Sequence, residues 1–404
     1  MGVSEQSAGL RRYADVLAFP GVGRIVAAAL IGRLPGGMAP LAMLLLVRGE
    51  GRSYAVAGVV VAASSLASAA GSPLLGRIVD RTGQARLLLW LAFAYPAALT
   101  ALVLLAIHHA PVIALVVCAA VSGAVVPPVG ACMRALWPEL VSGPGLRDTA
   151  YAFEAWVQEV FFILGPLIVA AIASLVAPWA AVMAAAAFAL IGSVWFALAP
   201  AVRAVRPSPR SSRAGALESS ALRTVLLSSF ALGMAFGVAE VLMPAFGEAH
   251  GSRAQGGFAL ASFACGSLIG GLWIGTRPAA RRLGTRFAVS LGLLALALLP
   301  PLVAPSLPVM CVLMLIAGMP IAPAFAASYG LVDELGVPGT ATEAFSWLTT
   351  AIVGGLAVGT SGGGAAIDSL GITGALALAA PCAAIAALVA FLRHASLTVP
   401  EPVP

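Results

Sequence analysis

The sequence predicts an all-α integral membrane protein with twelve transmembrane helices arranged as two six-helix bundles. Three observations lead to this prediction. First, 61% of the 404 residues are hydrophobic and only 9% are charged, whereas about a quarter of the residues in soluble domains are charged. Second, the apolar residues gather in runs of about 20, the length that crosses a bilayer as a helix. Third, one polar stretch divides these runs six and six.

Charges and turn residues bound the twelve apolar runs, and most loops between them are short. The N-terminal bundle is expected within residues 1–200 and the C-terminal bundle within residues 224–404. A cytoplasmic linker rich in Arg, Ser and Pro (201–223) joins them. In chain order the predicted spans are 20–47, 53–75, 87–107, 111–133, 150–174 and 177–199, then 224–247, 256–276, 287–306, 308–330, 344–366 and 371–392.

The basic residues predict the orientation of these spans. All 22 are arginine, because the sequence contains no lysine. If the N-terminus is cytoplasmic, 18 of the 22 fall on the cytoplasmic side, Arg134 among them as part of a loop, and only Arg48, Arg52 and Arg253 fall outside. Cytoplasmic loops of membrane proteins are enriched in arginine and lysine. We therefore expect a multi-pass protein of the cell membrane with both termini in the cytoplasm, and the net charge of +6 does not indicate nucleic-acid binding.

The residue types present argue against an enzyme. Without lysine there is neither a P-loop NTPase signature nor a lysine Schiff base. The five cysteines lie at scattered positions inside spans, and the four histidines lack a neighbouring cluster of carboxylates or cysteines. We expect no metal, no cofactor and no catalytic residues.

Two segments indicate that the bundles are repeats of one another. Residues 149–156 open the fifth span and residues 340–347 open the eleventh. Glu154 of the first segment aligns with Glu343 of the second at a shift of 189 residues, and the same shift aligns Gly165 with Gly354. Parallel six-helix repeats of this kind hold a substrate site between the halves, near the middle of the membrane.

The loop between the second and third spans carries the most specific motif. Residues 76–86, with Gly76, Asp80, Arg81 and Gly83, resemble the G-x-x-x-D-R-x-G-R-[KR] signature of the major facilitator superfamily. The usual basic pair after the second glycine is replaced by Gln-Ala. The corresponding loop of the second half, residues 281–286, keeps the glycine and arginines but has no aspartate.

That resemblance implies a transporter in which Asp80 and Arg81 hold the halves together on the cytoplasmic side in the outward-facing state. The residues themselves are compatible with this role. Gly76 and Gly83 allow a tight turn and close helix approach, and Asp80 can pair with a neighbouring helix end. The alternative is a solvated loop that only sets the topology.

A second, weaker resemblance concerns Gly165-Pro166 in the fifth span. This dipeptide is similar to the centre of the antiporter motif of the superfamily's proton-coupled exporters, although its flanking residues differ. It implies a helix hinge, and an ordinary proline kink is the alternative. Glu159 lies seven residues before Pro166, close to two helical turns, so both lie on one face of the helix.

Three charges are predicted deep inside spans: Arg33, Glu159 and Glu240. A charge in hydrocarbon costs roughly 2.5–3.5 kcal/mol, so each must face protein or water. They either form structural ion pairs or line a cavity that handles substrate and protons. Glu154 and Glu343 are shallower, and we expect them to act as gate residues or helix caps, with Thr340 and Glu343 at capping-box spacing.

Together these features predict a secondary transporter that works by alternating access. The expected function is proton-coupled efflux of a small hydrophobic or amphipathic compound, by a monomer in the lipid bilayer. Proton-symport import of a small organic solute would use the same fold. A transport-inactive membrane sensor or scaffold is the third alternative.

Overall fold

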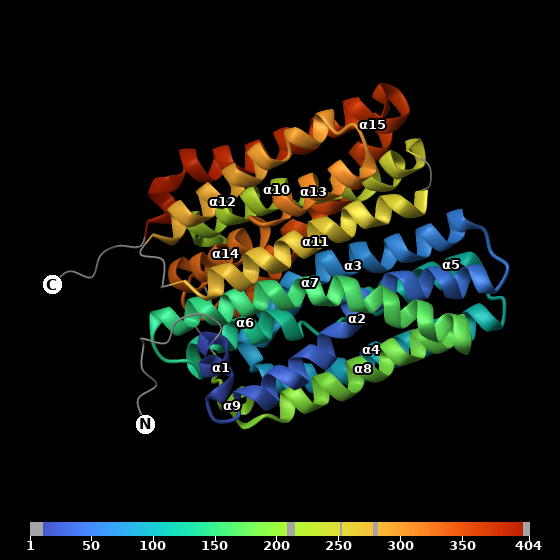
Figure 1. Ribbon diagram of the computed structural model, residues 1–404. Coiled ribbons are helices and arrows are strands. Elements are labelled where there is room, and N and C mark those ends of the chain that lie inside the picture. The colour runs from blue at the N-terminus through green and yellow to red at the C-terminus, as the bar shows by residue number, and fades with distance from the viewer. Residues whose placement is uncertain (1–10, 208–214, 251–252, 278–281, 399–404) are drawn as a thin grey trace.

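The computed structural model describes residues 11–207, 215–250, 253–277 and 282–398, and these ranges contain helices and no strand (Figure 1). Part of the predicted linker (208–214) and Arg281 lie outside the described residues. After α1 (Arg11–Ala18), the N-terminal half consists of α2 (Val22–Gly49), α3 (Tyr54–Thr82), α4 (Gln84–Ile107), α5 (Val112–Ala124), α6 (Val129–Leu140), α7 (Pro144–Leu175) and α8 (Pro178–Leu198).

The linker region begins with α9 (Pro200–Ala204) and ends with the short 3-10 helix η1 (Gly215–Glu218). The C-terminal half then consists of α10 (Ser220–Ala249), α11 (Arg253–Gly275), α12 (Leu283–Ala297), η2 (Pro300–Val303), α13 (Leu307–Gly318), α14 (Ile321–Leu335), α15 (Ala341–Leu392) and η3 (His394–Leu397).

These helices confirm the predicted fold class. Eleven of the described helical segments are long and apolar enough to cross a membrane. A shorter apolar segment, Ala377–Leu392, follows Gly371, whose φ of 72° divides α15 into two helical parts. Six segments therefore fall on each side of the linker. Large apolar side chains such as Trp90 and Phe93 are exposed on the outside, as expected for a surface that faces lipid.

Two predicted spans are broken helices, which the sequence analysis did not anticipate. The fourth consists of α5 and α6, separated at Pro127-Pro128, and the tenth consists of α13 and α14, separated before Ile321. Proline at a helix interior removes a backbone donor and favours such a break. Because the two breaks occupy equivalent places in the two halves, they support the internal repeat.

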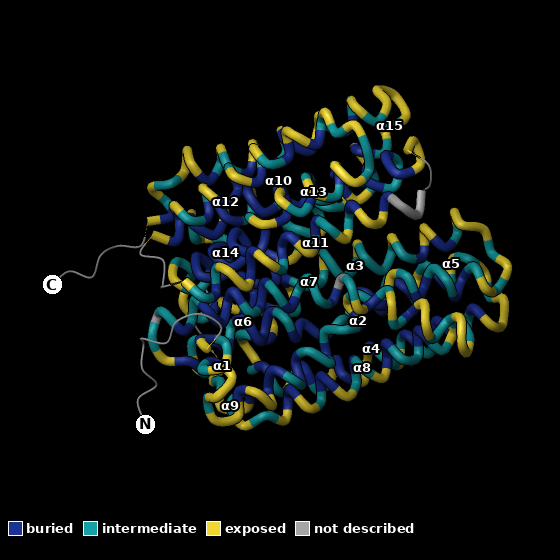
Figure 2. Tube along the Cα trace, viewed as in Figure 1, coloured by how far each residue is buried: buried dark blue, intermediate teal, exposed yellow. Residues whose placement is uncertain are grey.

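Both halves meet at one end of the molecule, which we call the termini end. There lie α1, α9, η1 and the C-terminal part of α15 (Figure 1). Buried residues concentrate around α6 and α14 near this end, whereas exposed residues follow the outer helices (Figure 2). The described hydrogen bonds between the halves gather from this end towards the middle of the bundle.

Glycines set the close crossing of α2 and α7. A Cβ atom added to Gly37 would lie 2.4 Å from the Phe161 carbonyl oxygen, and one added to Gly165 would lie 2.5 Å from the backbone of Gly37. These distances are too short for any side chain, so the two backbones touch directly. Small residues at such crossings let membrane helices pack closely. Gly36, by contrast, points into open space and would meet nothing within 4 Å.

This crossing gives a matched pair of substitutions on one helix. Gly37→Ala is expected to destabilise the folded protein by about 1–3 kcal/mol, because α2 and α7 must move apart. Gly36→Ala is expected to leave the stability unchanged or to raise it slightly, since alanine is the better helix former. Thermal unfolding in detergent measures both. Equal melting temperatures for the two variants would contradict the close crossing.

Candidate functional site

The carboxylate of Asp80 binds the first turn of α15, in the opposite half of the protein. Its two oxygens accept hydrogen bonds from the backbone N–H groups of Thr342 (3.1 Å) and Glu343 (2.9 Å). These N–H groups have no partner within their own helix, and the helix dipole favours a negative charge at this position. Asp80 is therefore an N-terminal cap supplied by the other half.

The predicted capping box of Thr340 and Glu343 is wrong. The Thr340 hydroxyl donates to the Val337 carbonyl (2.8 Å) and makes no capping hydrogen bond to α15. The physical reason is that Asp80 already occupies the free N–H groups that the capping box would use. Glu343 turns instead towards α3.

Glu343 forms an ion pair with Arg77, again between the halves. The guanidinium donates to both carboxylate oxygens, at 3.1 and 2.9 Å. Glu343 is 2% exposed and Arg77 is 29% exposed. Backbone at the end of the linker covers this pair, because a side chain at Gly215 would collide with both charged groups. The motif arginine that carries this ion pair is therefore Arg77, which the sequence analysis did not single out.

The two glycines of the motif are needed for different reasons. A Cβ atom on Gly76 would lie 2.7–2.8 Å from Ser346, Glu343 and Thr342 of α15, so only glycine allows this approach. Gly83 has a φ of 91° and connects α3 directly to α4, a conformation that glycine adopts at no steric cost. The Arg81 side chain is exposed.

A buried polar group in the N-terminal half surrounds Glu154. Arg33 donates to Glu154 at 2.7 Å and to Gln158 at 3.2 Å, and its guanidinium lies 5.1 Å from the centre of the Phe161 ring. The indole of Trp137 donates to the other Glu154 oxygen at 3.2 Å. Arg33 and Glu154 thus form an ion pair whose side chains are 8% and 2% exposed.

Arg134 is the main residue that the sequence analysis misplaced. The expected fourth span ended before it, whereas α6 carries it into the interior with 4% exposure. It donates to Thr349 of α15 at 3.0 Å, and its guanidinium lies over the rings of Tyr329 and Phe345. Its Nε atom is buried without a hydrogen-bond partner. The Pro127-Pro128 break before α6 was the available signal.

Glu159 and Glu240 lie in different surroundings. The Glu159 carboxylate on α7 accepts a hydrogen bond from Ser267 of α11 at 2.9 Å, which joins the halves nearer the middle of the bundle. Glu240 lies on α10 with an exposed side chain, and within the described part of the chain it has no hydrogen bond or ion pair. The structure does not bring Arg33, Glu159 and Glu240 together as one set.

The Gly165-Pro166 dipeptide lies within α7, which continues as one helix from Pro144 to Leu175. Gly165 makes the close contact with Gly37, one to two turns beyond Glu159. The carboxylate and the close crossing of α7 with α2 therefore belong to the same stretch of α7.

The short helix α1 adds contacts that the sequence analysis did not anticipate. Tyr13 donates to the Gly271 carbonyl of α11 at 2.8 Å, and Arg12 donates to the carbonyl of Arg277. Burial raises the pKa of Tyr13 to about 12, against the opposite effect of the Arg286 charge. The phenol therefore keeps its proton and remains a donor across physiological pH.

Two further contacts join the halves. Thr350 donates to the Ala69 carbonyl at 2.8 Å, and Arg286 pairs with Asp148 at 3.4 Å. Within the described residues, no group of three or more His, Cys, Asp or Glu side chains could hold a metal ion. The candidate site is thus an interface between two halves, held by Asp80, Arg77 and Glu343 at its end and by Glu159 further in.

Sequence comparison with curated proteins finds no match. Among solved structures, a bacterial homologue of the iron transporter ferroportin in the outward-facing state has a TM-score of 0.75 and 15% identity, over 92% of this chain and 99% of that one. The human organic anion transporter MFSD10 has a TM-score of 0.69 and 18% identity, over 92% and 99% of the chains.

The E. coli fucose:proton symporter FucP is a third similar structure, with a TM-score of 0.65 and 13% identity over 92% of this chain and 98% of that one. At these identities the similarity establishes the fold. The family model described as Major Facilitator Superfamily matches residues 25–275 and, in a second match, residues 225–404. The chain therefore belongs to the major facilitator superfamily and is a multi-pass membrane transporter.

Proposed function

We propose that this transporter exports a small hydrophobic or amphipathic compound in exchange for protons. The observation that carries the proposal is the Glu159–Ser267 hydrogen bond, which places a carboxylate of α7 directly against the opposite half. A carboxylate at such an interface responds to protonation by changing the contact that joins the halves. No other described carboxylate combines an intramembrane position with a side-chain bond across the interface at that depth.

We propose that the protein lies in the cell membrane and that its closed termini end faces the cytoplasm. The arginine distribution supports this orientation, since loops at this end carry most of the 22 arginines. In that orientation the conformation is outward-facing. The ferroportin homologue with a similar fold was also solved in an outward-facing state.

The proposed cycle couples the proton to this closed end. When Glu159 is ionised, Ser267 donates to a charged acceptor, and such hydrogen bonds are stronger than neutral ones. When a proton enters from the open side, the Ser267 bond weakens and the halves are freer to separate at the termini end. The proton then leaves to the cytoplasm as the compound enters the cavity from that side.

Other residues have supporting roles in the proposal. Gly76, Asp80, Arg81, Gly83 and Glu343 form the cytoplasmic gate, and Glu154 supports it from the buried group around Arg33. In the proposed cycle, α7 bends at Gly165 and Pro166. Arg33 positions Glu154 and Gln158 beside this stretch. Glu240, exposed on α10, meets the compound or a proton in the cavity.

Removing the titrating group tests the coupling. Glu159→Gln keeps a side chain of similar size but cannot carry a proton, so transport driven by a pH gradient is expected to fall at least about tenfold. Proteoliposomes with an internal pH-sensitive dye, given a panel of hydrophobic and amphipathic compounds, measure the proton movement. Glu248→Gln, at an exposed position of α10, is the matched control and should behave as wild type.

A second readout separates lost coupling from lost folding. Exchange of labelled compound without a pH gradient should persist in Glu159→Gln, because binding and closure do not need the proton. Full gradient-driven transport by this variant would contradict the proposal. If the wild-type protein moves the compound but no protons, the proposed proton coupling is wrong and the protein is a uniporter. Uptake that is driven by inward proton flow would favour the importer, and no transport of any compound would favour the sensor or scaffold.

Alternating access can be tested with a removable lock. The Thr350 hydroxyl lies 2.8 Å from the Ala69 carbonyl, so α3 and α15 are in contact at this point, and the test introduces Ala69→Cys together with Thr350→Cys. Oxidation should fix the termini end closed and abolish transport, and a reductant should restore it. Each single cysteine variant is the control and should stay active under oxidation. A double variant that remains active while fully cross-linked would contradict alternating access at this end.

A further inference from the structure

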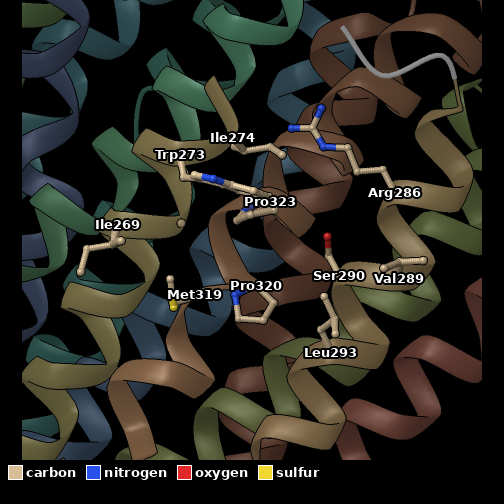
Figure 3. A pocket seen from close by; sticks show the side chains of 11 residues that line it. Ile269, Trp273, Ile274, Arg286, Val289, Ser290, Leu293, Met319, Pro320 and Pro323 are labelled. Carbon is tan, nitrogen blue, oxygen red and sulfur yellow. The ribbon is translucent and has the colours of Figure 1, made fainter. Parts of the chain in front are cut away.

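A groove on the outer face of the C-terminal half adjoins the interface between the halves, to which its residue Arg286 also belongs. It has a volume of about 380 Å³, within the range of small-ligand sites. It lies between α11, α12 and α14 (Figure 3). The lining is apolar except for one guanidinium and one hydroxyl, and consists of Ile269, Gly270, Trp273, Ile274, Arg286, Val289, Ser290, Leu293, Met319, Pro320 and Pro323.

The polar and apolar parts of this groove are separated along its length. Arg286 lies in the first turn of α12, next to the termini end, whereas Leu293 and Met319 lie deeper along the bundle (Figure 3). Trp273, Val289 and Leu293 are each more than half exposed, so the groove opens to the outside of the bundle. In a membrane protein that outside is lipid.

The charge of Arg286 is only partly satisfied by protein. One terminal nitrogen pairs with Asp148 of the opposite half at 3.4 Å, a long distance for an ion pair. Its Nε atom is buried and has no hydrogen-bond partner. A guanidinium can bind an anionic oxygen through two parallel hydrogen bonds, which makes arginine a favoured binder of phosphate.

We propose that this groove binds an anionic phospholipid of the bilayer leaflet at the termini end. The phosphate would bind Arg286 and an acyl chain would lie along Val289, Leu293 and Met319. Arg286 lies in the first turn of α12, at the start of a membrane span, where lipid headgroups meet their chains, and its charge is opposite to that of the phosphate. Because the same guanidinium holds Asp148, the lipid and the opposite half compete for Arg286.

Native mass spectrometry of the full-length protein, titrated with phosphatidylglycerol or phosphatidylcholine, tests this site. Wild-type protein should bind at least one phosphatidylglycerol about fivefold more tightly than phosphatidylcholine, because phosphatidylglycerol has a net negative charge whereas the choline cation of phosphatidylcholine opposes the charge of Arg286. Arg286→Gln should reduce that preference to within about twofold. Arg282→Gln removes the same charge one turn earlier, at an exposed position outside the groove, and should keep the preference.

Two further variants separate lipid binding from contact between the halves. Asp148→Asn removes the competing carboxylate and should bind phosphatidylglycerol at least as tightly as wild type. Ser290→Leu fills the groove and should weaken binding of both lipids. Equal losses in Arg286→Gln and Arg282→Gln, or equal wild-type affinity for the two lipids, would overturn the proposal. Weaker lipid binding in Asp148→Asn would also overturn the proposal, because the binding would then depend on the contact between the halves and not on a free Arg286 charge.

Discussion

The closed end of this transporter depends on one carboxylate that caps a helix of the opposite half. Asp80 accepts hydrogen bonds from two backbone N–H groups at the start of α15, and hydrogen bonds to charged groups contribute roughly 1.5–3 kcal/mol each. The neighbouring Arg77–Glu343 pair is partly open to solvent at Arg77, where ion pairs contribute less. Gly76 lets the two helices approach closely enough for both contacts. Since helix capping needs no particular side chain on α15, the lock can form and release without rearranging the core.

Inside the bundle, charge is concentrated in one group rather than spread along a path. Arg33 and Arg134 both lie beside Gly130, and Glu154 is the carboxylate that bonds directly to Arg33. Arg134 is held by Thr349 and by aromatic rings of the C-terminal half. A buried guanidinium with few hydrogen bonds is costly unless it is compensated, and here part of the compensation comes from the opposite half. Separation of the halves would therefore change the surroundings of Arg134 as well as those of Asp80.

The sequence was sufficient to predict what depends on composition and periodicity. The apolar helical segments and the contact of Asp80 with a neighbouring helix end both follow from local patterns. The sequence could not predict which side chains pair with which groups of the opposite half. Thr340 had the spacing to cap α15, and only the packing of α3 on α15 decides that Asp80 does so instead. Arg134 was misplaced for a similar reason, because a proline-broken helix and a loop have the same local signature.

Spin-label distances between the halves test the central claim most directly. With the five native cysteines replaced, labels on Arg86→Cys and Arg393→Cys report the width of the termini end, since both positions are exposed and lie in different halves. The account predicts one predominant distance for the otherwise unaltered protein. After Asp80→Asn it predicts a change of at least about tenfold in the population ratio in favour of a longer distance, with a smaller change after Arg77→Gln. An unchanged distance distribution after Asp80→Asn would contradict it.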